Sequence, residues 1–77
     1  MTQNAKNQMR MLSEVGGIRI ETWNECQLWA VTSDERIEWY MLGSTGTHRV
    51  SEEFEGTLFP TERVMAHWRG FVRNQNN

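Results

Sequence analysis

The chain of 77 residues contains one cysteine, one proline and no long run of apolar residues. Because Cys26 has no partner for an intramolecular disulfide, the bridged frameworks that stabilise many small secreted domains are excluded. No stretch has the apolar centre of a signal peptide or the length of a membrane-spanning helix. We therefore expect a soluble, cytoplasmic protein without membrane contacts.

Net charge is also small. The chain has eight Lys and Arg residues and ten Asp and Glu residues, which gives a formal charge of -2. The overall field therefore neither attracts nucleic acid strongly nor imitates it, and any electrostatic function must be local. At this length we expect residues 1–77 to form a single domain with a small core.

Motifs for catalysis, cofactors and metals are missing from the sequence. Cys26, His48 and His67 do not have the close paired spacing of a zinc site. Cys26 lies in a predicted turn beside Glu25, whose charge raises the pKa of a thiol. Residues 43–48 (GSTGTH) do not contain the lysine of a phosphate loop, and no strained turn presents a nucleophile. We therefore predict a protein that is not an enzyme and that has no cofactor and no bound metal.

The chain is rich in tryptophan, with four such residues: Trp23, Trp29, Trp39 and Trp68. Tryptophan contributes much of the apolar burial in small cores, and it is also enriched at binding hot spots. The position of each ring in the fold must therefore decide between a core and an interface.

Residues 28–42 (LWAVTSDERIEWYML) have the β-branched and aromatic composition of a β-hairpin with a loop at residues 33–36. The expected register pairs Thr32 with Ile37, Ala30 with Trp39 and Leu28 with Met41. One side of the hairpin then carries Leu28, Ala30, Ile37, Trp39 and Met41. The other side carries Trp29, Val31, Tyr40 and Leu42, with Glu38 as its one charged residue. Neither side is typical of a solvated face.

Residues 17–23 (GIRIETW) alternate like a third strand, and residues 24–27 (NECQ) are the expected turn before the hairpin. A four-residue turn pairs Trp23 with Leu28 on the first side and places Ile18 and Ile20 on the second. A turn one residue longer exchanges them, so the register around residues 24–27 stays open.

Two interpretations compete for residues 48–56 (HRVSEEFEG), which follow an expected flexible loop at 43–47. Ser51 and the acids after it could form one capped helical turn. The segment could equally be an edge strand that holds Val50 and Phe54, with its charges discouraging edge pairing. We favour the helical turn.

The sequence from Pro60 to Asn74 predicts an amphipathic helix with Pro60 in its first turn, followed by a frayed tail at 74–77. Its apolar arc consists of Val64, Met65, Trp68, Phe71 and Val72, and Gly70 falls on the polar side. A second helix is predicted over residues 3–15 from the spacing of Ala5, Met9, Leu12 and Val15, with Thr2 and Gly16-Gly17 at its ends. Because Asn4 and Asn7 disfavour helix, residues 1–16 could instead form a flexible arm.

These elements predict an α+β domain in which a three-stranded, or four-stranded, antiparallel sheet packs one face on the C-terminal helix. The other face exposes more aromatic surface than monomers leave to water. It could be covered by the N-terminal helix, by a second copy of the chain or by a different protein.

For function we expect a protein-binding module, a small regulator or inhibitor that occupies a partner's surface. In general character the chain resembles the small regulators encoded by phages and other mobile elements, a likeness that names no target. The expected anchors are Trp29 and Tyr40, with charge at the rim from Glu38, Glu52, Glu53 and Glu55. The alternatives are a homodimeric structural subunit, and a nucleic-acid-binding protein that uses Arg63, His67, Arg69 and Arg73.

Overall fold

The computed structural model describes residues 3–33, 36–50, 54–55 and 60–75. In chain order the elements are α1 (Gln3–Glu14), β1 (Ile18–Trp23), β2 (Cys26–Ser33), β3 (Arg36–Gly43), β4 (Gly46–Arg49), β5 (Phe54–Glu55) and α2 (Glu62–Gln75). The described strands form an antiparallel sheet of order β1-β2-β3-β4, and β5 also pairs with β3. The predicted α+β class is confirmed.

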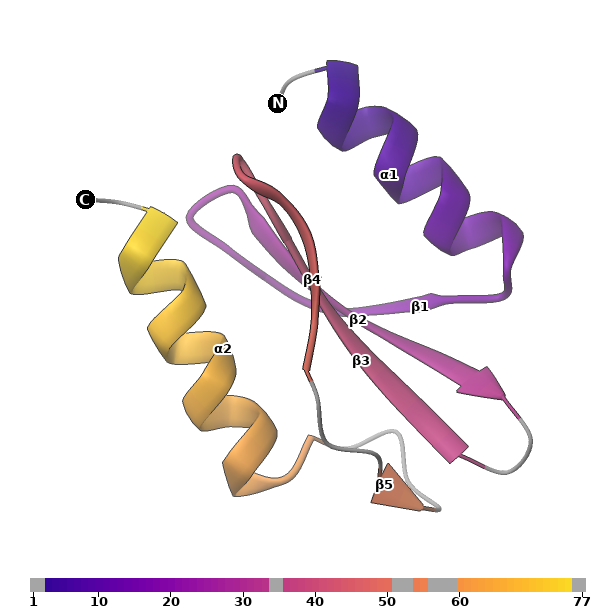
Figure 1. Ribbon diagram of the computed structural model, residues 1–77, viewed down its shortest axis with the longest axis vertical. Helices are drawn as coiled ribbons and strands as arrows, with labels where there is room; N and C mark the ends of the chain where they lie inside the picture. Colours follow the sequence, from indigo (N-terminus) through magenta and orange to yellow (C-terminus); the bar gives the residue numbers. More distant parts are fainter. Residues whose placement is uncertain (1–2, 34–35, 51–53, 56–59, 76–77) are drawn as a thin grey trace.

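The two helices lie on opposite faces of the sheet (Figure 1). We call these faces the α1 face and the α2 face. The molecule therefore has three layers. The sequence left three possible covers for the second face of the sheet, and α1 is the one that covers part of it. Within the described residues, neither helix is both long enough and apolar enough to span a bilayer.

The central hairpin has the register that the alternation predicted. Thr32 lies opposite Ile37, Ala30 opposite Trp39 and Leu28 opposite Met41. Its α2 face belongs to the larger core cluster, which consists of Cys26, Leu28, Ala30, Ile37, Trp39, Met41, Val50, Val64, Trp68, Phe71 and Val72. Its α1 face carries a smaller cluster of Leu12, Trp29 and Val31, with Met9 and Tyr40 packed against it.

The helix α2 buries the predicted apolar arc and begins two residues later than expected. Val64, Trp68, Phe71 and Val72 are buried, and Met65 is partly buried. The Thr61 hydroxyl accepts a hydrogen bond from the backbone N–H of Val64 at 3.3 Å. Thr61 is therefore the N-cap, and Pro60 precedes the helix instead of lying in its first turn.

The helix α1 ends in a pair of glycine hydrogen bonds. The N–H of Gly17 donates to the Leu12 carbonyl at 2.8 Å, and the N–H of Gly16 donates to the Ser13 carbonyl at 3.1 Å. Gly16 has a φ of 84°, so this is a Schellman motif with Gly16 in the left-handed conformation. Because the helix stops at this motif, Val15 lies beyond the regular turns and is exposed, although the sequence placed it on the buried stripe.

The turn between β1 and β2 differs from the prediction. Trp23 lies opposite Cys26, so the turn has two residues, Asn24 and Glu25, both with positive φ. Cys26 and Gln27 are buried strand residues, because pairing with β3 favours extending β2 over a longer turn. Trp23 lies on the α2 face, the side that a four-residue turn would also have given it, but its partner is Cys26 instead of Leu28.

A bulge between Arg19 and Glu21 decides on which face of the sheet the two isoleucines of β1 lie. Ile18 lies opposite Ala30, and Ile20 packs against the larger cluster. Both therefore belong to the α2 face, whereas a four-residue turn would have placed them on the other side, an allocation that the sequence left open.

The segment after Leu42 forms strands where a loop was predicted. Gly43 pairs with Gly46 across a two-residue turn, and β4 continues to Arg49. Phe54 and Glu55 then pair with β3, so the edge-strand interpretation holds for them and the preferred helical turn is wrong there. Residues 51–53 lie outside the described residues.

Candidate functional site

The α1 face of the sheet is not fully closed by its helix. A groove of about 230 Å³ remains between α1 and the strands, lined by Gln8, Met11, Leu12, Val15, Val31, Tyr40 and Thr47. We call it the α1 groove. Its lining is mainly apolar, because Met11, Leu12 and Val15 line it together with Val31 and the ring of Tyr40.

Two large apolar side chains stand at this groove in solvent. Met11 is 64% exposed and Val15 is 63% exposed. They are four positions apart near the C-terminal end of α1, so they form one apolar edge. Methionine is flexible and polarisable, which suits a surface that adapts to an apolar partner.

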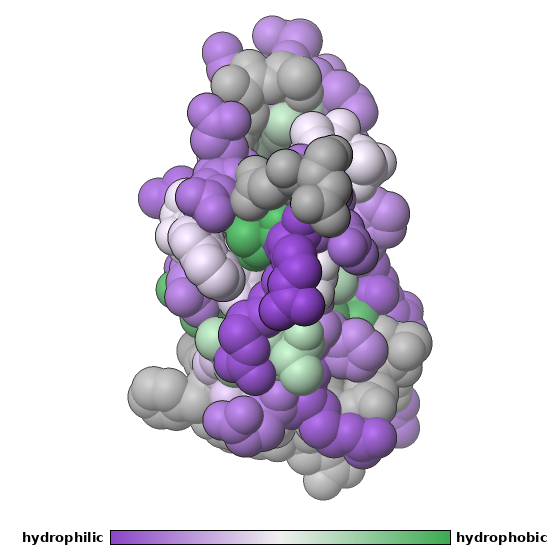
Figure 2. All heavy atoms as spheres, turned by 90° about the vertical axis from the view of Figure 1, so that its left-hand side faces the viewer, coloured by the Kyte–Doolittle hydropathy of each residue, from purple (hydrophilic) through white to green (hydrophobic). Residues whose placement is uncertain are grey.

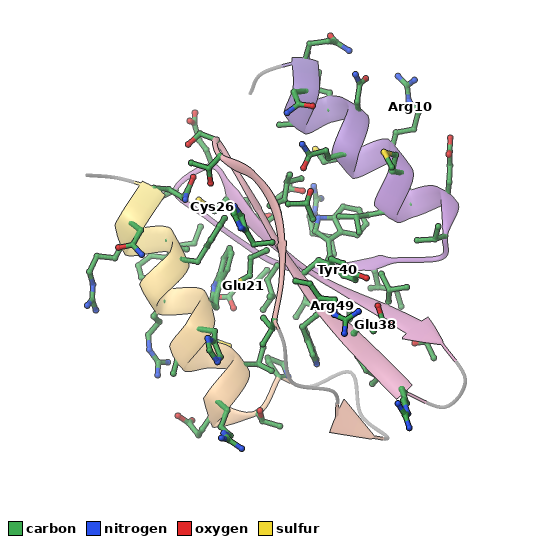
Figure 3. The ribbon with its side chains drawn as sticks, in the orientation of Figure 1. Arg10, Glu21, Cys26, Glu38, Tyr40 and Arg49 are labelled. Carbon is green, nitrogen blue, oxygen red and sulfur yellow. The ribbon has the colours of Figure 1, made fainter. Side chains whose placement is uncertain are left out.

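A polar cluster adjoins the groove on the same face (Figure 3). The Tyr40 hydroxyl donates a hydrogen bond of 2.5 Å to Oε2 of Glu38. Arg49, which lies opposite Tyr40 across β3 and β4, places Nη1 3.9 Å from the same carboxylate oxygen. We call Glu38, Tyr40 and Arg49 the charged rim. The side chains of Glu38 and Arg49 are 25% and 48% exposed, so both charges can reach a ligand at the surface.

The hydrogen bond to Glu38 also makes the phenol a weaker acid. It raises the pKa of Tyr40 together with partial burial and the charge of Glu38, while Arg49 acts in the opposite direction. A tyrosine hydroxyl is neutral at physiological pH even with an ordinary pKa, so this group is a hydrogen-bond donor there.

The other end of the groove is also held by a polar contact. The Thr47 hydroxyl in β4 donates a hydrogen bond to Oε1 of Gln8 in α1. This contact ties the helix to the edge strand, so that the groove has a wall on each side.

The predicted anchors are separated by the fold. Trp29 is 5% exposed and lies beneath α1 with Leu12 and Val31, where its indole N–H donates to Oε1 of Gln27 at 2.9 Å. Tyr40 and Glu38 are only partly buried. Of the acids expected at the rim, Glu52 and Glu53 lie outside the described residues. Glu55 belongs to β5, where its backbone pairs with Arg36 of β3.

Met11, Val15 and Arg49 are site residues that the sequence did not single out. The sequence pattern assigned Val15 to the buried stripe, and Met11 has no place in that pattern. Arg49 lies beside Tyr40 only because β4 pairs with β3. The sequence gave no other indication of β4 than the possibility that residues 48–56 form an edge strand.

The predicted nucleic-acid residues lie along the solvent side of α2. Arg63, His67, Arg69 and Arg73 are all exposed. Figure 2, which views the molecule from this side, shows a column of hydrophilic side chains. Arg69 places Nη2 3.9 Å from Oε2 of Glu62, so part of the positive charge on this surface is compensated. Large exposed aromatic side chains for stacking bases are not found on α2.

His67 also lines a second groove, of about 460 Å³, between α2 and the edge of the sheet. The groove contains His48, whose ring lies 5.4 Å from that of Phe71 and is held by the Thr45 hydroxyl at 3.1 Å. Among the described residues, no group of three potential metal ligands comes together.

Cys26 is buried in the larger core cluster at 2% exposure. Burial raises the pKa of its thiol, and the charge of Glu25 raises it further. The sequence anticipated the effect of Glu25, whereas the larger effect of burial follows from the extension of β2. A protonated, enclosed thiol is a poor nucleophile.

Comparisons of the chain with protein-family models, with curated proteins and with solved structures find no match.

Proposed function

We propose that the protein is a non-enzymatic protein-binding module, a small regulator or inhibitor that occupies the surface of a partner protein. The observation that carries this proposal is the α1 groove itself: an apolar recess with exposed Met11 and Val15 beside it and the charged rim next to it. An apolar centre with a polar rim is the usual anatomy of a protein interface.

The partner chemistry follows from the groove. A recess of about 230 Å³ accommodates one large apolar side chain, which Met11, Val15 and the ring of Tyr40 would contact. Glu38 and Arg49 lie 3.9 Å apart and present both signs of charge, so a partner with a polar residue beside its apolar anchor fits best. The buried, protonated state of Cys26 is compatible with the reducing cytoplasm that we propose as its location.

Matched lysine substitutions in the two helices test this proposal. Met11→Lys places a charge at the groove, and Ala66→Lys places the same charge at an exposed position of α2. We expect affinity capture from the native host to yield a protein that binds the parent and Ala66→Lys but not Met11→Lys. With the purified partner, Met11→Lys should weaken binding at least about tenfold, or about 1.4 kcal/mol.

Equal binding by the parent and Met11→Lys would contradict the proposal. Titration with single-stranded and double-stranded oligonucleotides at low salt tests the alternative on α2. Binding that Arg69→Ala and Arg73→Ala abolish, and that Met11→Lys leaves unchanged, would assign the function to nucleic acid instead.

A further inference from the structure

The strand β1 forms one edge of the sheet. In the order β1-β2-β3-β4 it has a neighbour on one side only within the described part of the chain. Five of its six residues are exposed, and Ile20 is partly buried. The outward N–H and C=O groups of such an edge can pair with a further strand. This edge lies across the sheet from β4, away from the charged rim.

Two exposed apolar side chains mark the ends of this edge. Ile18 and Trp23 are each 46% exposed, and they account for two of the four large apolar side chains exposed in the described residues. Ile18 lies opposite Ala30 and Trp23 opposite Cys26, so both belong to the α2 face.

The bulge is what places both of them on one face. In a regular strand, residues five positions apart point to opposite faces. Here Ile20 packs on the α2-face core and Glu21 pairs with Leu28 of the same face. Arg19 and Thr22, which flank the bulge, belong to the α1 face.

We propose that β1 pairs with β1 of a second copy of this chain, antiparallel and about a two-fold axis that passes between Ile20 and Glu21. This register places Ile18 opposite the second copy's Trp23, Arg19 opposite its Thr22 and Ile20 opposite its Glu21. Every opposed pair then shares a face. A shift by one position in either direction places an α1-face residue opposite an α2-face residue.

The surface beside Trp23 suits this arrangement. A hollow of about 400 Å³ lies next to it on the α2 face, lined by Glu21, Thr22, Trp23, Met65, Trp68 and Arg69. In the proposed register, Ile18 of the second copy contacts the Trp23 ring at the mouth of this hollow. The two-fold axis repeats the contact, so both exposed apolar side chains of each copy are covered.

Bulges and charged residues also protect edges from pairing. In this register, however, no two like charges lie directly opposite each other, and the extra residue of each strand lies at the axis. Because six residues form a short interface, we expect a dimer that dissociates on dilution.

Sedimentation of the full chain over a series of concentrations tests the association. We expect dimer at high concentration and monomer after dilution. Trp23→Lys should weaken dimerisation at least about tenfold, whereas Met11→Lys, which places the same charge at an even more exposed apolar position on α1, should not. A monomer at every concentration, or a dimer that Trp23→Lys leaves unchanged, would overturn the proposal.

A thiol cross-linking experiment tests the register. Ile18→Cys and Trp23→Cys are prepared separately, each with Cys26→Ala, and treated with a short bis-maleimide. Opposed positions are about 5 Å apart, whereas the two copies of position 18 are about 16 Å apart. We expect covalent dimer only when the two variants are mixed. Efficient cross-linking of either variant alone, or of Met11→Cys with Cys26→Ala, would refute the register.

Discussion

Tyr40 takes part both in the lining of the α1 groove and in the charged rim. Its pKa is raised chiefly by the hydrogen bond to Glu38 and then by burial. A group whose pKa is higher in the folded than in the unfolded state stabilises the fold below its ordinary pKa. That stabilisation is lost as the pH rises through the folded-state pKa. The loss of this stabilisation is therefore confined to alkaline solution, and the stabilisation itself is fully present at neutral pH.

Replacing Tyr40 with Phe should remove this alkaline dependence. The ring remains in the groove, but the hydrogen bond to Glu38 is lost, which should lower the free energy of unfolding by about 1 kcal/mol at neutral pH. Urea denaturation between pH 7 and pH 11 measures both effects. The parent should lose stability above pH 10 more steeply than Tyr40→Phe, and identical slopes would contradict the role given to this hydroxyl.

Trp29 and Tyr40 show how far single residues could be interpreted from the sequence. Alternation placed both on the same face, and they do lie opposite each other across β2 and β3. Burial separates them, since Trp29 packs under Leu12 while Tyr40 reaches the groove. No local pattern encodes which of two neighbouring rings a distant helix covers.

The helices show that amphipathic spacing predicts an element more reliably than its ends. The apolar arc of α2 was predicted residue by residue, whereas its start depends on the hydrogen bond between Thr61 and Val64. Gly70, on the polar side, has no heavy atom within 4 Å of the position that a Cβ would occupy, apart from its chain neighbours and the nearby backbone of α2.

Gly70→Ala should therefore stabilise the protein. Alanine loses less backbone entropy in a helix and meets no obstacle here, so we expect the free energy of unfolding to rise by up to about 1 kcal/mol. Gly17→Ala is the contrasting variant. Its Cβ would lie 2.6 Å from the Leu12 carbonyl oxygen, so it should destabilise the fold. Thermal unfolding distinguishes the two, and destabilisation by Gly70→Ala would show that the position is less open than described.

The turns were harder to predict than the strands that they join. The sequence Asn24-Glu25 does not have the glycine that favours a two-residue turn with positive φ, and Glu25 nevertheless adopts a φ of 65°. Extending β2 to Cys26 buries that side chain and Gln27, and it pairs Gln27 with Leu42. These contacts offset the local strain, and they exist only once β3 is in place.

The three-layer arrangement leaves two of the tryptophans with very different solvent exposure. Trp29 lies between α1 and the sheet at 5% exposure, whereas Trp23 is 46% exposed at the sheet edge. Substituting a buried tryptophan with alanine typically costs about 3–5 kcal/mol, and surface substitutions usually cost about 0.5 kcal/mol or less.

We expect Trp29→Ala to destabilise the monomer by about 3 kcal/mol or more and Trp23→Ala by less than about 1 kcal/mol. Denaturation at a concentration low enough to exclude association measures both. If Trp29→Ala costs as little as Trp23→Ala, α1 does not cover the sheet in solution.

Alternation in residues 28–42 and the helical spacing after Pro60 were enough to predict the hairpin, its register and the buried face of α2. These are local properties, because a strand period of two and a helical period of 3.6 are written in consecutive residues. The cover of the α1 face, the bulge in β1 and the pairing of β4 depend on contacts between segments far apart in the chain. The α1 groove and the charged rim consist of such contacts, since Met11, Tyr40 and Arg49 come together only when a helix and two strands pack.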